Sequence, residues 1–233
     1  MVQIPYKTAL VVGTGPGIGT SVARALSAAG ARVAVAARNS ERLSSLAQEI
    51  GGAAFAVDAT DPASVAALFD DVDRSIGIPE VVLFNAAGRV RGPVTDIDPG
   101  QVRHAIEVSA YGGFLVLQQA ARRLVPLGHG AILLTGATAS VKGFANSSGF
   151  AIGKFGLRGL AQSAARELAP KGIHVAHFVI DGGVRSAGRP DPTGAPDSTL
   201  DPDAIADAYL AVLAQHRSAW SWEVELRPWV EPF

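Results

Sequence analysis

The chain has 233 residues, of which 48% are hydrophobic, and its 20 basic and 21 acidic residues leave a formal net charge of −1. This size and apolar content suit one domain with a substantial core. Balanced charge without a Lys/Arg-rich run gives no indication of binding to nucleic acid or an anionic membrane surface. The absence of cysteine excludes disulfides and thiolate metal sites, and residues 1–10 resemble neither a signal peptide nor a membrane anchor. We therefore expect a soluble, cytoplasmic protein.

Short apolar segments alternate with helical patterns along the whole chain. We expect strands over Thr8–Val12, Arg32–Ala37, Ala53–Val57, Val81–Phe84, Ala131–Thr135 and Ile173–Ile180, and a final edge strand over Trp222–Leu226. The first six segments lack polar alternation, which is typical of parallel strands that are buried on both faces. The repeated strand and helix order predicts a single α/β domain over residues 1–233, with a doubly wound parallel sheet and helices on both faces.

Several helix ends can be predicted from capping residues. Ser40 is a candidate cap for a helix that continues through Ile50 and stops at Gly51. Asp61 and Asp201 each precede a proline, and this pair is typical of a cap followed by the first helical position.

Residues 185–202 interrupt the alternation of strands and helices. They contain several Gly and Pro residues and three aspartates but almost no large apolar side chain, so we expect a mobile loop. The loop follows a strand at the carboxyl edge of the sheet, where ligands of such folds bind. We interpret it as a lid over the site, and a passive surface loop is the alternative.

A glycine-rich turn follows the first strand and opens a helix that ends near Gly30. Its sequence is Gly13-Thr14-Gly15-Pro16-Gly17-Ile18-Gly19. Glycines let the backbone turn tightly and approach a pyrophosphate, whose charge then lies at the helix N-terminus. The turn predicts a dinucleotide site. The alternative is that its glycines serve only close packing between helix and strand.

The end of the second strand bears on which dinucleotide is bound. No Asp or Glu occurs before Glu41, and the strand ends with Ala36, Ala37 and Arg38. A carboxylate at this place would hold the ribose diol of NAD, whereas an arginine can bind a 2′-phosphate bidentately. We therefore expect NADP(H) as the preferred cofactor, with NAD(H) as the second possibility. In the alternative interpretation Arg38 stacks on the adenine or points to solvent.

Several motifs in this order resemble those of the short-chain dehydrogenase/reductase family. The glycine turn resembles its TGxxxGxG motif, Asp58 its adenine-contacting aspartate, and residues 85–88 its NNAG motif, which braces the sheet. Lys154 resembles the lysine of YxxxK, and residues 181–186 resemble the PGxVxT segment beside the nicotinamide. The resemblance implies a Rossmann-like fold in which the cofactor is bound by Gly13, Gly15, Gly17, Ile18, Gly19, Arg38, Asp58, Asn85, Ala86, Gly88, Lys154, Gly182, Val184 and Ser186.

The departures from the family concentrate at its catalytic group of Asn, Ser, Tyr and Lys. Lys154 matches, but the resemblance places Phe150 at the tyrosine, Ala137 at the serine and Ser109 at the asparagine. A phenyl ring can neither donate nor accept a proton. Loss of a positioned general acid typically lowers a rate by about 10²- to 10⁴-fold.

Five hydroxyl side chains are candidate substitutes for the missing proton donor. They are Tyr111, Thr138, Ser140, Ser147 and Ser148. The alternative roles are loop hydrogen bonding for Thr138 and Ser140 and helix capping for the two adjacent serines. Tyr111 is alternatively a packing residue on a long helix that ends before Pro126.

Two functions from different classes fit these features. The first is an NADP-preferring oxidoreductase that acts on a small carbonyl or alcohol compound with altered proton delivery. The second is a cofactor-binding protein without turnover, acting as a sensor or partner subunit, and a scaffold without ligand is a third. The five histidines lack zinc-ligand spacing, so we expect them to be structural or exposed and expect no metal site. The family resemblance implies a homodimer or homotetramer built from helices over residues 101–125 and 150–169.

Overall fold

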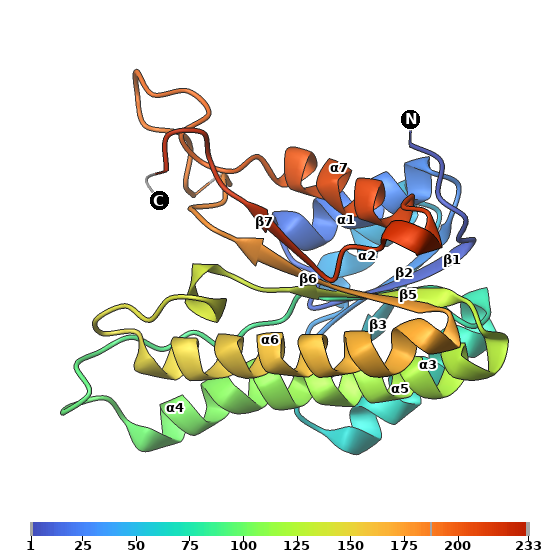
Figure 1. Cartoon of the computed structure of the whole chain (residues 1–233), viewed down its shortest axis with the longest axis horizontal. Coiled ribbons are helices and arrows are strands. Elements are labelled where there is room, and N and C mark those ends of the chain that lie inside the picture. The colour runs from blue at the N-terminus through green and yellow to red at the C-terminus, as the bar shows by residue number, and fades with distance from the viewer. Residues whose placement is uncertain (1, 187, 232–233) are drawn as a thin grey trace.

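A seven-stranded parallel sheet forms the centre of the computed structural model, which describes residues 2–186 and 188–231 (Figure 1). The strands are β1 (Thr8–Val12), β2 (Arg32–Ala37), β3 (Ala53–Ala56), β4 (Val81–Phe84), β5 (Gly130–Thr135), β6 (Ile173–Ile180) and β7 (Glu223–Leu226). Their order is β3-β2-β1-β4-β5-β6-β7, and every neighbouring pair is parallel. The predicted α/β doubly wound fold is confirmed, as is the edge position of the last strand. Predicted strand ends differ by one residue at β3, β5 and β7.

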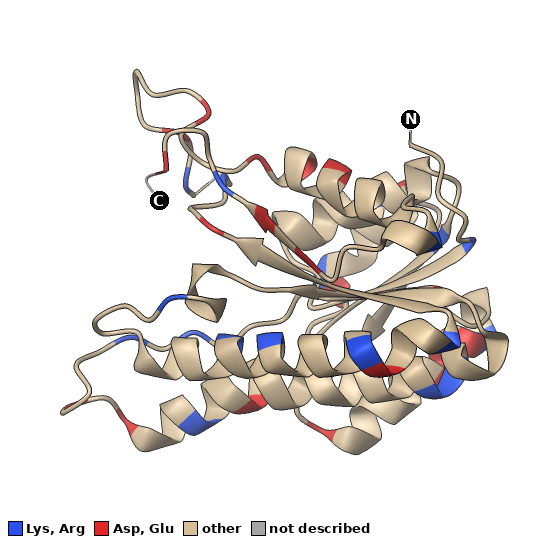
Figure 2. Ribbon diagram, in the orientation of Figure 1, with Lys and Arg blue, Asp and Glu red and all other residues tan. Residues whose placement is uncertain are grey.

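Helices cover both faces of this sheet. The α-helices are α1 (Ile18–Ala28), α2 (Ser44–Glu49), α3 (Pro62–Ile76), α4 (Pro99–Ile106), α5 (Gly112–Leu127), α6 (Ser148–Leu168) and α7 (Pro202–Leu213). Helices α1, α2 and α7 share one core with one face of the sheet, and α3, α5 and α6 share a second core with the other face. The central strands carry almost no charged residue (Figure 2). This explains why the strand sequences lack polar alternation.

Both predicted aspartate caps are confirmed. Asp61 Oδ1 accepts a hydrogen bond of 3.0 Å from the backbone N–H of Ala63 at the start of α3. Asp201 Oδ1 accepts one of 2.9 Å from the backbone N–H of Asp203 at the start of α7. Each bond satisfies a backbone donor that the first helical turn leaves without a partner.

The predicted cap at Ser40 is wrong. Its hydroxyl makes no capping bond, and a 3₁₀ turn over Glu41–Leu43 comes before α2. The Asn39 side-chain oxygen accepts the backbone N–H of Glu41 at 3.1 Å, so the neighbouring residue supplies the acceptor instead. Helix α2 ends at Glu49, one residue before the predicted end at Ile50, and Gly51 follows the C-cap with φ +60°.

The long helix predicted before Pro126 is interrupted and also continues further than expected. A π-helical turn over Glu107–Tyr111 separates α4 from α5. Helix α5 includes Pro126 and ends at Leu127, and its C-cap Gly128 is left-handed with φ +63°. Pro126 removes one N–H donor from the last turn, and the helix continues past it for a single residue.

Ion pairs organise residues 185–202. Arg185 pairs with Asp191 at 3.2 Å and Asp197 at 3.7 Å, and it also contacts Asp201. The Asp191 carboxylate accepts the backbone N–H groups of Asp197 and Thr199. The three aspartates that distinguish this segment therefore converge on one arginine.

Candidate functional site

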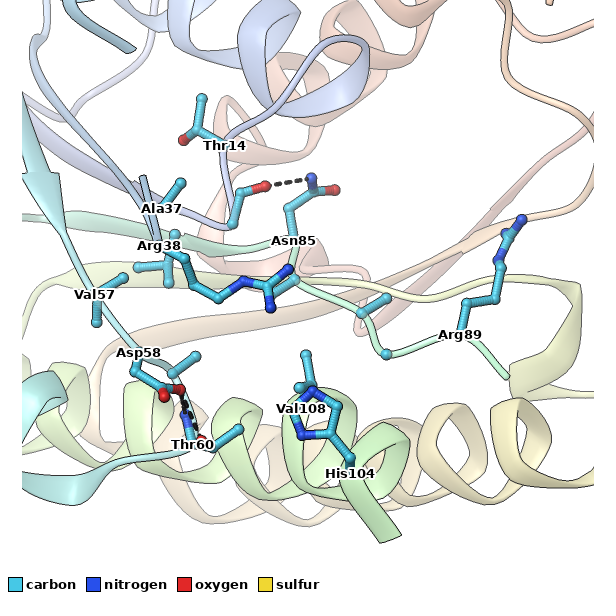
Figure 3. Close-up of a pocket in the computed structure, with 16 residues that line it drawn as sticks. Thr14, Ala37, Arg38, Val57, Asp58, Thr60, Asn85, Arg89, His104 and Val108 are labelled. Carbon is cyan, nitrogen blue, oxygen red and sulfur yellow. Dashed lines mark hydrogen bonds between the residues drawn. The ribbon is translucent and has the colours of Figure 1, made fainter. Parts of the chain in front are cut away.

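The turns that follow β1, β2, β3 and β4 surround a hollow at the carboxyl edge of the sheet (Figure 3). Its volume is about 470 Å³, and predicted cofactor residues Gly13, Arg38, Asp58 and Asn85 are among those that line it. Two adjoining hollows extend from it along the outer side of the glycine turn and toward Ser186. This edge is where open parallel α/β sheets bind their ligands.

The glycine turn packs against the turn after β4. Gly13 has a φ of +81°, and a Cβ on it would lie 2.3 Å from the backbone nitrogen of Ala86. Asn85 Nδ2 donates a hydrogen bond of 3.1 Å to the Gly13 carbonyl, so this amide braces the turn. Gly15 and Gly17 face open space, and the N-terminus of α1 begins beside them. The glycine turn and the N-terminus of α1 thus form a cradle, which leaves room for a phosphate where side chains would block it.

Opposite charges face the hollow at its β2 and β3 end. Arg38 is exposed, and Figure 3 shows its guanidinium pointing into the hollow toward Asn85. Asp58 Oδ1 accepts hydrogen bonds from the Thr60 hydroxyl at 2.7 Å and the Thr60 backbone N–H at 2.9 Å. These bonds, assisted by the charges of Arg38 and His104, lower the pKa of Asp58 and keep it ionised.

Lys154 is buried on α6 with only 2% of its surface exposed. Its Nζ donates a hydrogen bond of 2.7 Å to the carbonyl of Thr135 at the end of β5. Burial, and to a smaller extent the nearby charge of Arg89, lower the pKa of Lys154 to about 7. No carboxylate among the described residues pairs with it.

Phe150, at the position predicted for the proton donor, lies one turn before Lys154 and is 8% exposed. The guanidinium carbon of Arg89 lies 4.8 Å from the centre of its ring, a cation–π contact. Figure 3 shows Arg89 across the hollow from Val57 and Asp58. No motif in the sequence singles out Arg89, although it is a basic residue directly after Gly88 of the NNAG-like segment.

The side chains expected at the serine and asparagine positions are not free for chemistry. Ser109 is fully buried, and its hydroxyl accepts the N–H of Gly88 at 2.9 Å. Next to Ala137, which has no hydroxyl, the Ser140 hydroxyl accepts the Ala137 N–H at 3.1 Å. Loop hydrogen bonding is thus confirmed for Ser140. The half-buried Thr138 has no hydrogen bond to its hydroxyl within the described part of the chain.

Of the other candidate proton donors, Tyr111 has the alternative packing role, whereas neither adjacent serine caps α6, whose first residue is Ser148. Tyr111 is 44% exposed and stacks on Phe114 at a ring distance of 6.4 Å. Ser147 is the first residue before α6, but its hydroxyl makes no capping bond, so the capping role proposed for it is wrong.

The segment expected beside the nicotinamide divides into two parts. Val184 and Ser186 line a hollow of about 420 Å³ together with Gly17 and Ile18, so the predicted residues do meet. Gly182 instead packs against Pro228, whose Cδ would lie 2.7 Å from a Cβ on that glycine. Asp181 pairs with Arg227 at 2.9 Å.

Two histidines of β6 have structural roles, as predicted. His174 stacks on Trp220 and bonds the Ser221 carbonyl at 2.8 Å, and the fully buried His177 bonds Glu223 at 3.1 Å. No three His, Cys, Asp or Glu residues of the described chain gather as metal ligands would. Likewise, none of the helices in the described segments combines the length and apolar character of a membrane span.

Removal of the buried Lys154 charge should stabilise the cofactor-free protein. The pKa of Lys154 is about 7 in the folded protein, against an ordinary value of 10.5. Between these two pH values the unfolded state binds more protons than the folded state, so the free energy of unfolding rises with pH. We expect Lys154→Met to raise the free energy of unfolding at pH 7 by about 2 kcal/mol or more. The gain should shrink toward pH 10 in urea unfolding, and the exposed Lys142→Met control should show no such trend. A gain in the free energy of unfolding that does not change with pH would contradict its attribution to the buried charge of Lys154.

Comparisons with known proteins agree with this geometry. The family model described as enoyl-(acyl carrier protein) reductase, adh_short_C2, matches residues 13–193. D-threitol dehydrogenase of Mycolicibacterium smegmatis is 31% identical over 179 residues, covering 74% of this chain and 68% of that protein.

Solved structures extend the similarity to almost the whole chain. A short-chain dehydrogenase from Rhodopseudomonas palustris has a TM-score of 0.83 at 36% identity, covering 96% of this chain and 99% of that one. An alcohol dehydrogenase from Thermococcus sibiricus, complexed with 5-hydroxy-NADP, has a TM-score of 0.85 at 25% identity, covering 97% and 98%. Fold, glycine turn and family match together show that the chain belongs to the short-chain dehydrogenase/reductase family of oxidoreductases.

Proposed function

We propose that this protein transfers hydride between NADP(H) and a small carbonyl or alcohol compound. The observation that carries the proposal is the glycine cradle, where Gly13 and Ala86 touch and no side chain obstructs a pyrophosphate. The relative that acts as a D-threitol dehydrogenase and the alcohol dehydrogenase bound to 5-hydroxy-NADP support this reaction class.

Residues around the cradle have separate proposed roles toward the cofactor. Gly15 and Gly17 would receive the pyrophosphate at the N-terminus of α1, and Asp58 would accept from the adenine amino group. Arg38 and Arg42, which line the same outer hollow, would hold a 2′-phosphate. Lys154, held by the Thr135 carbonyl, would bind the nicotinamide ribose hydroxyls. Bound NADP(H) would supply or accept the hydride.

Proton delivery in this protein must differ from delivery by a phenol. Phe150 has no ionisable group, and an arginine such as Arg89 does not deprotonate in proteins. We propose that solvent water beside Lys154 supplies the proton, with the lysine charge favouring its transfer. We further propose that residues 185–202 act as a lid, since Ser186 and the glycine turn line one hollow.

A cofactor-binding protein without turnover is the second candidate function. It is favoured by the inert ring of Phe150, which is buried beneath Arg89. Both candidates require NADPH binding, so turnover distinguishes them.

The first test follows NADPH oxidation with a panel of carbonyl compounds. We expect slow turnover by the wild type, and turnover about 10²-fold faster in the Phe150→Tyr, Ala137→Ser double variant, because a proton donor and its polarising hydroxyl are restored. The single Ala137→Ser variant is the control, since it restores no acid. No oxidation by the wild type, with turnover appearing only in the double variant, would favour binding without turnover.

The second test concerns cofactor preference. Arg38→Asp should weaken NADPH binding by about 10²-fold, because a charge-assisted bidentate contact becomes a repulsion. NADH binding should be retained, since the new carboxylate can accept the ribose hydroxyls. Fluorescence titration with both cofactors measures the change, and Arg38→Lys, which keeps the charge, should lose much less. Equal losses for NADPH and NADH would refute the role of Arg38.

The third test concerns assembly. Large apolar side chains remain exposed on neighbouring α5 and α6, namely Phe114 (40%), Ile152 (52%) and Phe155 (43%). We propose that a second copy covers them in a homodimer or homotetramer. Phe155→Arg should reduce the mass measured by light scattering, whereas Val94→Arg, at a loop residue that is 79% exposed, should not. A monomeric wild type would contradict the assembly.

A further inference from the structure

A cluster of arginines without acidic partners lies at the Phe150 end of the site. It consists of Arg89, Arg91 and Arg189, and within the described residues none of the three is within ion-pair distance of a carboxylate. Arg89 and Arg91 belong to the loop between β4 and α4, and Arg189 belongs to the segment after β6. Figure 2 shows basic positions on both of these loops. The cluster therefore carries uncompensated positive charge.

The carboxylates that line hollows together with Arg89 are Asp58 and Asp98, and both accept hydrogen bonds within their own turns. Asp58 accepts from Thr60, and Asp98 accepts the backbone N–H of Gln101 at the start of α4. The aspartates of the loop pair with Arg185, as described above. Within the described residues, neither Asp58 nor Asp98 is within ion-pair distance of Arg89.

This arrangement is electrostatically unfavourable without a ligand. Desolvation lowers the pKa of Arg89, and the charges of Arg91 and Arg189 lower it further. Arg89 in turn contributes to the lowered pKa of Lys154. Arg89 lines the main hollow and Arg189 lines the adjoining hollow beside Ser186. Repelling cations that face the hollows of a site are a feature of sites that bind an anion.

The position of Arg89 separates it from the proposed phosphate contacts of the cofactor. Those contacts lie at the glycine turn and at Arg38, whereas Arg89 lies over Phe150, one turn before Lys154. The ring contact also orients the planar guanidinium, whose fork matches the paired oxygens of a carboxylate or phosphate. Arg89 is exposed and can therefore reach a ligand.

We propose that Arg89, assisted by Arg189, binds an anionic group of the substrate, so that the substrate is a carbonyl or alcohol compound carrying a carboxylate or a phosphate. This inference rests on the proposed function, because it places the anion beside the hydride-transfer position. Arg89 binds and orients the substrate and transfers no proton.

The test uses isothermal titration of the protein saturated with NADP⁺. The probes are benzoate, phenyl phosphate and their neutral analogue benzamide, whose rings suit the apolar surface of Phe150. We expect at least one anion to bind about tenfold or more tightly than benzamide, and Arg89→Gln to remove that advantage, since its fork is lost. NADP⁺ affinity should change by less than about twofold, because the proposed phosphate contacts of the cofactor lie elsewhere. The anion that binds more tightly indicates whether the substrate carries a carboxylate or a phosphate.

A matched control removes one positive charge far from the site. Arg122→Gln, on the exposed surface of α5, should leave the affinities for both anions unchanged. Equal affinity of the wild type for anions and benzamide, or undiminished anion binding by Arg89→Gln, overturns this inference alone. So does a loss of NADP⁺ affinity in Arg89→Gln, since the arginine would then serve the cofactor. Absence of NADP⁺ binding by the wild type overturns the proposed function and this inference with it.

Discussion

Close contact between two backbone turns determines where every other part of the site lies. Gly13 approaches Ala86 so closely that a Cβ would lie 2.3 Å from the Ala86 nitrogen, and the Asn85 amide holds the same carbonyl at 3.1 Å. The ends of β1 and β4 are thereby joined, and the N-terminus of α1 points into the space that remains. Any larger residue at Gly13 would separate these turns and displace the cradle. The geometry of the site therefore depends on the lack of a side chain at Gly13 as well as on the side chains that line the hollow.

The opposite end of the site has a phenyl ring, that of Phe150, at the position where the family resemblance predicts a phenol. The aromatic ring of Phe150 remains packed on α6, and a guanidinium lies 4.8 Å from its centre. A cation above a ring face is attracted by the ring quadrupole, and at an exposed site the contact contributes about 0.5–1 kcal/mol. A neutral ring thus still orders a charged group. Phe150 cannot donate a proton, but the guanidinium of Arg89 gives this end of the site polar character.

Much of the fold could be predicted from local patterns, whereas the site could be predicted only where residues are adjacent in sequence. Uninterrupted apolar segments predicted the parallel sheet, and Asp61 before a proline predicted a cap that the structure confirms. The contact between Arg89 and Phe150 joins residues 61 positions apart, so no local pattern contains it. The convergence of the loop aspartates on Arg185 and the π-helical turn at Ser109 likewise depend on tertiary packing. Local sequence patterns predict elements and caps, whereas contacts between residues far apart in the sequence are known only from the folded structure.

The two cations nearest the proposed hydride-transfer position are coupled. No carboxylate in the described part of the chain pairs with the buried Lys154, and its pKa of about 7 reflects burial first and the charge of Arg89 second. An anion bound at Arg89 would offset that second effect and raise the pKa of Lys154. A lysine that is partly neutral in the empty site would then be more fully protonated when an anionic substrate is present. Substrate binding would thereby increase the positive charge beside the reacting oxygen, where the proposed reduction develops negative charge.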